Sequence, residues 1–207
     1  MLHQTRDPQG RMTAMEAEPA SSQDDRTARA AGLALVREVL QLRRPLPADD
    51  PPPIALRAFV AGEDDDAFLA VNNRAFDWHP EQGGWTHADL AARLAEPWFD
   101  AEGFLLHERD DQLAGFCWTK VHPASAEDPE LGEIFVIAVD PMFHGLGLGR
   151  ALTLAGLQHV ARRGVRTGML HVEGTNQPAR GLYDDLGFEL HSAHRWWALP
   201  ERPTGAA

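Results

Sequence analysis

The order of apolar and polar positions along the chain predicts alternating strands and helices. The run 134–139 is apolar and rich in β-branched residues, which predicts a buried strand. Pro141 ends this strand, because proline has no N–H to donate to a ladder. The segment 150–163 has the broad apolar stripe of a helix that packs on a sheet. A second passage from strand to helix follows at 168–186.

The remaining elements follow from the same patterns. The expected strands are 54–60, 103–108, 112–122, 168–173 and 188–199, and the expected helices are 63–76, 86–94 and 177–186. Thr86 and Asp89 have the spacing of a capping box, and Asp110-Asp111 predicts a hairpin turn. The segment 33–46 alternates only weakly and fits either a strand or a short helix.

Alternation within a strand also predicts which side chains share a face. Phe116, Trp118 and Lys120 are expected on one face of strand 112–122. By the same rule, Glu133, Phe135 and Ile137 are expected on one face of the central strand.

The sequence predicts one folded domain with flanking segments. Residues 1–32 are rich in Gln, Ser, Asp, Arg and Ala with little periodicity, and we expect them to be disordered. Residues 33–53 would be a strand remnant and a proline-rich linker. The domain would span 54–200, and 201–207 would be a tail.

Composition narrows the function classes. A chain of 207 residues with 43% hydrophobic residues can bury one good core. The net charge of −12 argues against a nucleic-acid or membrane partner. Neither an apolar signal core nor a run of the roughly 20 residues of a membrane span occurs, so a cytoplasmic protein is expected. Cys117 is the single cysteine and is expected to be a core residue, which leaves no thiolate metal cluster.

Lysine and tyrosine each occur only once in the chain. Of 19 basic residues only Lys120 is a lysine, and Tyr183 is the single tyrosine. Arginine cannot lose its proton, whereas lysine is a compact point charge. Both positions are therefore candidates for chemistry, although chance alone could leave one of each.

Three glycines at alternate positions, Gly145, Gly147 and Gly149, stand between the central strand and its helix. The free N–H groups and the dipole of a helix N-terminus favour an anion, and glycine lets the backbone approach a phosphate. The dinucleotide fingerprint G-x-G-x-x-G fails, because Arg150 or Leu152 stands where its third glycine is required. The P-loop fails as well, since no Gly-Lys-Ser/Thr follows. An ordinary glycine-rich turn is the alternative.

The pattern that fits resembles the pyrophosphate loop of the GNAT acyltransferases, Gln/Arg-x-x-Gly-x-Gly/Ala after a Val-Asp-Pro strand end, with His144 at the first position. The second half of the GNAT pattern, N-x-x-A-x-x-x-Y-x-x-L-G-F, begins at Asn176. This resemblance implies an α/β (α+β) GNAT fold, with a mixed, mainly antiparallel sheet and helices on both faces. The parallel strands 133–139 and 168–173 would splay apart at the centre to admit acyl-CoA.

Within that superfamily the chain resembles the mycothiol synthase family over residues 33–199. The stretches that carry the resemblance are "AVNNRAF", "HPEQGGW", "EPWFD", "FCWTKVHP", "GEIFVIAVDP" and "LHVEGTNQPARGLYDDLGF". That family acetylates the cysteinyl amine of cysteinyl-glucosaminyl-inositol with acetyl-CoA, using two tandem GNAT domains. The resemblance implies that only the catalytic C-terminal domain is present. The segment 33–47 would then be the last strand and linker of the first domain, left without its sheet.

The resemblance also implies the site residues. The catalytic residues would be Glu133 and Tyr183, and the substrate contacts would be Glu81, Lys120, Glu133 and His171, the last in place of a tyrosine. The acetyl-CoA contacts would be Ile137, Ala138, Val139, His144, Gly145, Leu146, Gly147, Leu148, Gly149, Arg150, Asn176, Ala179 and Arg180. No metal is expected, since the pair His191-x-x-His194 has only weak metal-like spacing.

The implied chemistry needs a base and an acid. A free α-amine has a pKa of about 7.7–8, so a modest base such as Glu133, acting directly or through a water, suffices. Tyr183 would protonate the leaving thiolate. Alternatively, Glu133 is only a strand-end carboxylate, Tyr183 a packing aromatic and Lys120 a solvated surface residue.

We therefore expect a monomeric N-acetyltransferase that acts on a small-molecule amine with acetyl-CoA. Two alternatives stay open at the level of sequence. The chain could acetylate another small amine or a peptide N-terminus, or it could be a non-catalytic remnant that only binds acyl-CoA.

Overall fold

A computed structural model describes residues 1–51, 53–79 and 81–200, and the chain forms two compact units. The first unit comprises Met1–Arg43 and the chain from His171 onward, and the second comprises Arg44–Leu170. Strands β3 and β8 cross this division. The expected limits 33–53 and 54–200 stay predictions, and the expected tail 201–207 lies outside the described residues.

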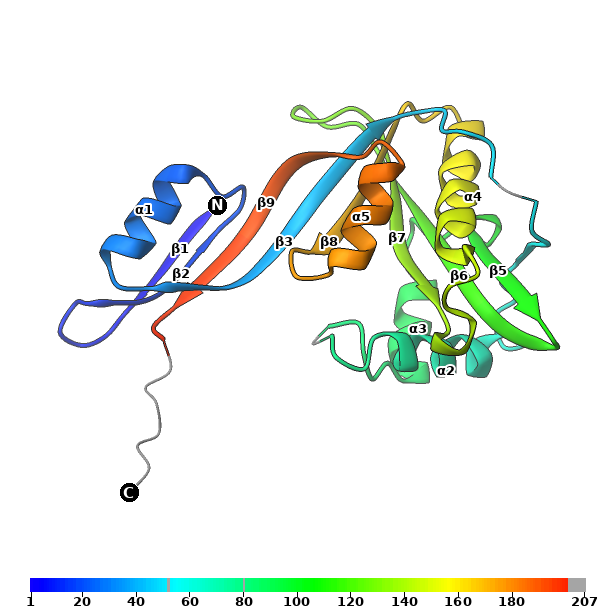
Figure 1. The fold of residues 1–207 in the computed structure, drawn as a ribbon, viewed down its shortest axis with the longest axis horizontal. Helices are drawn as coiled ribbons and strands as arrows, with labels where there is room; N and C mark the ends of the chain where they lie inside the picture. Colours follow the sequence, from blue (N-terminus) through cyan, green and yellow to red (C-terminus); the bar gives the residue numbers. More distant parts are fainter. Residues whose placement is uncertain (52, 80, 201–207) are drawn as a thin grey trace, which may run out of the picture. The chain divides into compact units, whose positions relative to one another are not determined.

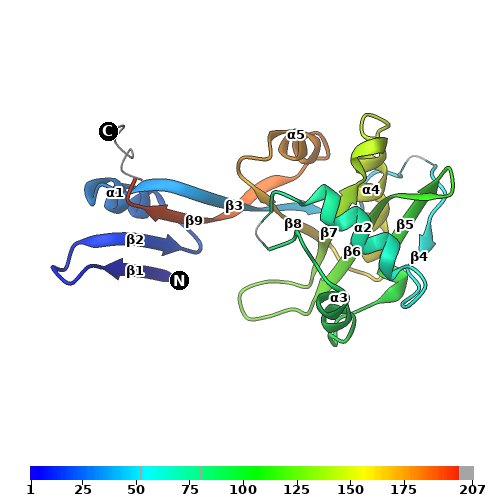
Figure 2. The ribbon, with the colours of Figure 1, turned by 90° about the horizontal axis from the view of Figure 1, so that it is seen from below.

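The second unit is a sheet with helices on both faces (Figures 1 and 2). Its elements are β4 (Arg57–Ala58), α2 (Asp65–Ala75), α3 (His87–Leu94), β5 (Phe104–Arg109), β6 (Gln112–His122), β7 (Leu131–Val139), α4 (Leu148–Arg162) and the start of β8 (Thr167–Glu173). The strand order is β8-β7-β6-β5-β4. All neighbours are antiparallel except β7 and β8, whose parallel ladder joins Leu131–Ile134 to Thr167–Leu170. The mixed, mainly antiparallel sheet is confirmed, and the splay of its parallel pair stays a prediction.

Two helices pack on opposite faces of this sheet. α4 lies against β6 and β7 so closely that a Cβ on Gly156 would come within 2.5 Å of Cys117 Sγ. On the other face, α2 inserts Phe68, which is fully buried. There Phe104 stacks between Phe59 and Trp118, with ring centroids 4.3 Å apart on each side. These apolar contacts hold β6 rigid where it carries the candidate site.

A β-bulge in β7 changes which side chains share a face. Trp118 lies opposite Val136 whereas Thr119 lies opposite Ile134, so Phe135 is the extra residue. The expectation that Glu133, Phe135 and Ile137 share a face is therefore wrong. Ile137 pairs with Cys117 on the face toward α4, whereas Glu133 pairs with Lys120 on the face that carries Trp118. The shared face of Trp118 and Lys120 is consistent with this register.

The first unit contains a second set of paired strands. Its elements are β1 (Leu2–Arg6), β2 (Met12–Ala17), α1 (Ser22–Ala30), β3 (Ala34–Pro45), α5 (Gln177–Asp185) and β9 (Glu189–Ala198). The strand order is β1-β2-β9-β3, and every pair is antiparallel. The segment 33–46 is therefore a strand, and it is not left without a sheet, because β3 pairs with β9 along most of its length.

Residues 1–32 are structured here, which corrects the expectation of a disordered tail. Ser21 and Asp24 form a capping box that begins α1, with the Asp24 N–H donating to the Ser21 hydroxyl and the Asp24 carboxylate accepting from the Ser21 N–H. α1 and β2 bury a small core; its members are Met15, Ala17, Ala28, Leu33 and Trp197. The sequence pattern of residues 1–32 did not predict this core, because Trp197, against which these residues pack, is distant in the sequence. In the second unit, a further expectation is corrected, because the strand expected at 54–60 is reduced to the short strand β4.

The segments β2-α1-β3 and β8-α5-β9 repeat one strand–helix–strand plan. Both helices have nine residues, and their N-cap residues, Ser21 and Asn176, lie 155 positions apart. The glycines that follow the helices, Gly32 and Gly187, lie 155 positions apart as well and share a positive φ of 77° and 74°. The buried helix positions that correspond are Ala28 and Tyr183. The chain thus carries two copies of this plan, of which only the second carries a hydroxyl at that position.

Trp197 tests whether the first 32 residues fold against β9. Its side chain is 4% exposed, so Trp197→Ala should lower the free energy of unfolding by about 3–5 kcal/mol. Trypsin should then cut at Arg11 and Arg26 faster. Trp78→Ala is the matched control, because Trp78 is 53% exposed. Urea denaturation and mass-mapped limited proteolysis would measure both variants, and unchanged cleavage in Trp197→Ala would show that the contact does not hold the segment.

Candidate active site

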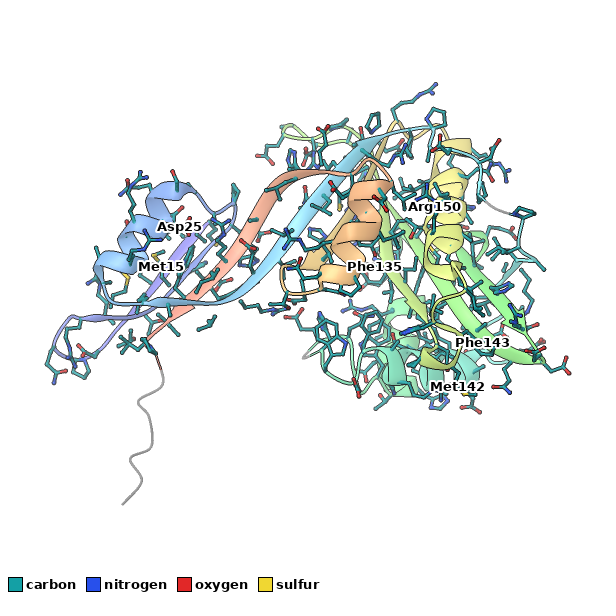
Figure 3. All side chains as sticks on the ribbon, in the orientation of Figure 1. Met15, Asp25, Phe135, Met142, Phe143 and Arg150 are labelled. Atoms are coloured by element: carbon teal, nitrogen blue, oxygen red, sulfur yellow. The ribbon has the colours of Figure 1, made fainter. Side chains whose placement is uncertain are left out.

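The candidate donor site begins where β7 ends. Asp140 is 2% exposed, and its carboxylate accepts a hydrogen bond of 2.9 Å from the Met142 N–H. This bond caps a short 3₁₀ turn, Pro141–Phe143, which leads away from the strand. Figure 3 labels Met142 and Phe143 on this turn, and the Met142 side chain is exposed.

Arg74 ties this turn to helix α2. Its guanidinium Nε lies 3.0 Å from Asp140 Oδ2, and Nη2 donates to the same oxygen. Burial alone would raise the pKa of Asp140, but the Met142 N–H and the Arg74 charge outweigh it, so the pKa lies below its usual value. The turn that precedes the glycine loop is therefore fixed by an ionised, hydrogen-bonded carboxylate.

The glycine loop leads directly into α4. Gly145 and Gly147 have φ of 80° and 74°, a conformation that residues with a Cβ rarely adopt. Gly147 is the N-cap, no side chain caps the helix, and its first turn has no acidic residue. The first-turn N–H groups of α4 thus lack a side-chain acceptor, as an anion site requires. His144 Nε2 lies 3.1 Å from the Val139 carbonyl oxygen at the start of this loop, so its ring lies beside the strand end.

The candidate acceptor site lies on β6 and β7. Lys120 and Glu133 are directly opposite in the ladder, and Glu133 is 7% exposed. The Lys120 ammonium lies 4.7 Å from the ring centroid of Trp98 and 5.7 Å from that of Phe135, which is labelled on β7 in Figure 3. Lys120 is therefore a half-buried cation held by two rings, which is not a freely solvated surface residue.

His122 completes this group, and it was missed at the level of sequence. Its Nε2 lies 2.7 Å from Glu133 Oε2, and its side chain is 34% exposed. The signal was present, because His122 follows Lys120 by two residues on a predicted strand and must share its face. The structure thus brings together Lys120, His122 and Glu133.

Glu81 lies on the loop after α2. The Trp85 indole N–H donates to the Glu81 carbonyl oxygen at 3.1 Å, and the Trp85 backbone N–H donates to Asn73 Oδ1 at 2.8 Å. Asn72 Nδ2 reaches the Gln82 carbonyl oxygen at 2.8 Å. These bonds fix the loop to α2, while the predicted substrate contact of Glu81 stays a prediction.

The predicted residues after β7 and its loop, which include His171, Asn176, Ala179 and Arg180, lie in the first unit, whereas 137–139 and 144–150 lie in the second. Asn176 begins α5 by accepting a hydrogen bond of 3.3 Å from the Ala179 N–H, and Arg180 Nη1 donates to the Gly174 carbonyl oxygen at 2.8 Å. His171 Nε2 lies 3.3 Å from Gln41 Nε2. The roles predicted for these residues stay predictions.

Tyr183 and Cys117 are both buried. Tyr183 is 7% exposed and packs edge-on against Phe188, with centroids 5.7 Å apart, so the expected packing role is present whether or not the hydroxyl reacts. Burial raises the pKa of the Cys117 thiol to about 12. Cys117 is therefore the inert core residue that the sequence predicted.

The second unit alone thus holds two complementary groups. The N-terminus of α4 with its glycine loop can bind a phosphate-bearing donor. The carboxylate and imidazole of Glu133 and His122 can receive a proton beside the fixed cation of Lys120. These are the parts of a group transfer from a phosphorylated carrier to a protonated nucleophile. None of the helices in the described ranges is long and apolar enough to cross a bilayer.

Residues 72–188 match the model of the acetyltransferase (GNAT) family. The chain is 51% identical over 180 residues to the mycothiol acetyltransferase of Thermomonospora curvata, covering 84% of this chain and 59% of that protein. It is 53% identical over 170 residues to that of Salinispora arenicola, covering 79% and 55%. A solved GCN5-related N-acetyltransferase from Sphaerobacter thermophilus is similar with a TM-score of 0.64 and 25% identity, over 86% of this chain and 56% of that chain. The chain therefore spans somewhat more than half the length of these relatives.

The pKa of Asp140 gives a prediction for stability. Because its folded pKa lies below the unfolded value of about 3.9, the ionised form stabilises the fold above that pH. Asp140→Asn should lose about 1–3 kcal/mol of unfolding free energy at pH 7, because Arg74 then lacks its charged partner. The difference from the unmodified chain should disappear as the pH falls through the folded pKa. Urea titrations between pH 7 and pH 2.5 would measure this, and a difference independent of pH would contradict it.

Proposed function

Because this chain belongs to the acetyltransferase (GNAT) family, we propose that it transfers the acetyl group of acetyl-CoA to the cysteinyl amine of cysteinyl-glucosaminyl-inositol. The observation that carries the proposal is the group of Lys120, His122 and Glu133 on β6 and β7, within the stretches that resemble mycothiol synthases. The relatives named mycothiol acetyltransferase support it. The product would be the acetylated thiol compound mycothiol.

The donor would bind at the loop 144–150. Its pyrophosphate fits the uncapped N-terminus of α4, where the absence of an acid leaves the positive end of the helix dipole available. Gly145 and Gly147 hold the turn that aims these N–H groups. Residues 137–139 would contact the pantetheine arm, and a backbone N–H there would donate to the thioester oxygen as it gains charge. Asn176, Ala179 and Arg180 are proposed as further acetyl-CoA contacts.

The acceptor must arrive as an amine with a free electron pair. Glu133 is buried beside Lys120 and His122, and it is the carboxylate on which we propose that removal of the amine's proton depends. The amine then attacks the thioester carbonyl, and Tyr183 is proposed to protonate the departing CoA thiolate.

The sugar and inositol hydroxyls need polar partners. We propose Lys120, Glu81 and His171 for this role, with Lys120 the best defined, since two rings hold its ammonium. The chain spans 59% of the length of the Thermomonospora protein. We also propose that the protein acts as a monomer and that it needs neither a nucleic acid nor a membrane as a partner.

The donor site can be tested at the exposed tip of the loop. Leu146 is 50% exposed, so Leu146→Asp should leave the fold intact while placing a negative charge beside the bound pyrophosphate. Acetyl-CoA affinity should fall about tenfold, equal to about 1.4 kcal/mol of charge repulsion. Leu146→Asn is the matched neutral control and should lose much less. Calorimetry would measure both, and equal affinities for the two variants would remove the loop from the acetyl-CoA site.

Turnover with a panel of amines tests the proposed reaction. Cysteinyl-glucosaminyl-inositol should be acetylated, and Glu133→Gln should lower kcat by roughly 10²-fold while acetyl-CoA affinity is kept. Preference for another amine or a peptide N-terminus would reassign the substrate. Tight acetyl-CoA binding without turnover of any amine would identify a non-catalytic acyl-CoA-binding protein.

A further inference from the structure

The pair His122–Glu133 has the geometry of a catalytic dyad. Glu133 Oε2 and His122 Nε2 are 2.7 Å apart, a normal charge-assisted hydrogen bond. An ionised carboxylate can only accept, so Nε2 must carry the hydrogen in this bond. In a neutral imidazole the other nitrogen, Nδ1, then has the free electron pair. Nδ1 of His122 has no hydrogen-bond partner among the residues that the structure describes.

The surroundings distinguish the two members of the pair. The Glu133 side chain is 9% exposed, whereas that of His122 is 34% exposed. Lys120 faces Glu133 from β6, and Met169 on β8 carries no charge. The charged or titratable groups on this face of β6 and β7 are Lys120, His122 and Glu133. The imidazole is therefore the member of the pair that a substrate can reach more easily.

We propose that His122 Nδ1 is the atom that receives the proton of the substrate amine, and that Glu133 is a positioning residue that fixes the required tautomer. This inference rests on the proposed acetyl transfer. An N–H bond of the substrate ammonium breaks, its electron pair stays on nitrogen, and an Nδ1–H bond forms. The imidazolium is stabilised by Glu133 and later releases its proton to solvent. Free imidazole has a pKa of about 6.5 and a free Glu about 4.3, so an imidazole matches an amine of pKa 7.7–8 more closely.

Substitution of each partner separates this scheme from direct proton transfer to Glu133. His122→Gln keeps an N–H that can donate to Glu133 but removes the basic nitrogen. If His122 is the base, kcat falls roughly 10²-fold, KM for acetyl-CoA is unchanged, and the double variant His122→Gln/Glu133→Gln is no slower than the slower single variant. If Glu133 is the direct base, His122→Gln keeps kcat within a few-fold, which would overturn the proposal.

His87→Gln is the matched control. His87 Nε2 lies 2.8 Å from Asp66 Oδ1 at an exposed position, so it repeats the histidine–carboxylate contact away from the candidate site. Its kcat should equal that of the unmodified chain, and a loss there would mean that such substitutions act through the fold.

A measurement without turnover tests the tautomer itself. Nitrogen-15 NMR of the histidine rings should show His122 with its hydrogen on Nε2, and this preference should be lost in Glu133→Gln. A hydrogen on Nδ1 in the unmodified chain would overturn the proposal whether or not the chain is active. Absence of turnover by the unmodified chain would instead refute the proposed acetyl transfer.

Discussion

The antiparallel ladder between β6 and β7, with its single bulge at Phe135, decides which side chains meet at the acceptor site. Trp118 pairs with Val136, and only because Phe135 is skipped does Lys120 then pair with Glu133. In an unbroken ladder Lys120 would face Ile134, and the Glu133 carboxylate would point toward α4. The bulge therefore moves one carboxylate from the helix-covered face to the face where Lys120 and His122 lie. Trp118, which pairs with Val136 just before the bulge, stacks on Phe104, and Phe104 stacks on Phe59.

A second constraint fixes the donor side of the same strand. β7 ends in Asp140, whose buried carboxylate is held by Arg74 of α2. The same helix inserts Phe68 into the aromatic core beneath β6. One helix thus stabilises both the strand that carries Lys120 and the turn that precedes the glycine loop. A change in the packing of α2 would therefore affect both the acceptor site and the donor site, although α2 contains no predicted site residue.

Local patterns predicted most elements of the second unit, because each of them has its own periodicity or cap. The capping box at Thr86 and Asp89 and the two left-handed residues of the hairpin, Asp110 and Asp111, are examples. The bulge could not be predicted, since it depends on the register between two strands. The prediction that residues 1–32 are disordered was wrong because Met15 and Ala17 pack against Trp197. Trp197 is far away in the sequence, so the pattern within residues 1–32 could not reveal this contact. The resemblance indicated Glu133 and Lys120, yet His122 emerged only when its distance to Glu133 was known.

The pairing of β3 with β9 has a consequence for how the protein is made. Ala34 lies opposite Ala198 in this ladder, so the two strands meet only after all the residues between them have been synthesised. Until then, α1 and β2 lack Trp197, the largest member of their core. Long-range antiparallel pairing of this kind is slow to form, and strands that wait for a partner are prone to aggregate. On the ribosome, β2, α1 and β3 would therefore emerge long before they can pack and pair with β9, and chaperones would have to protect them in the meantime.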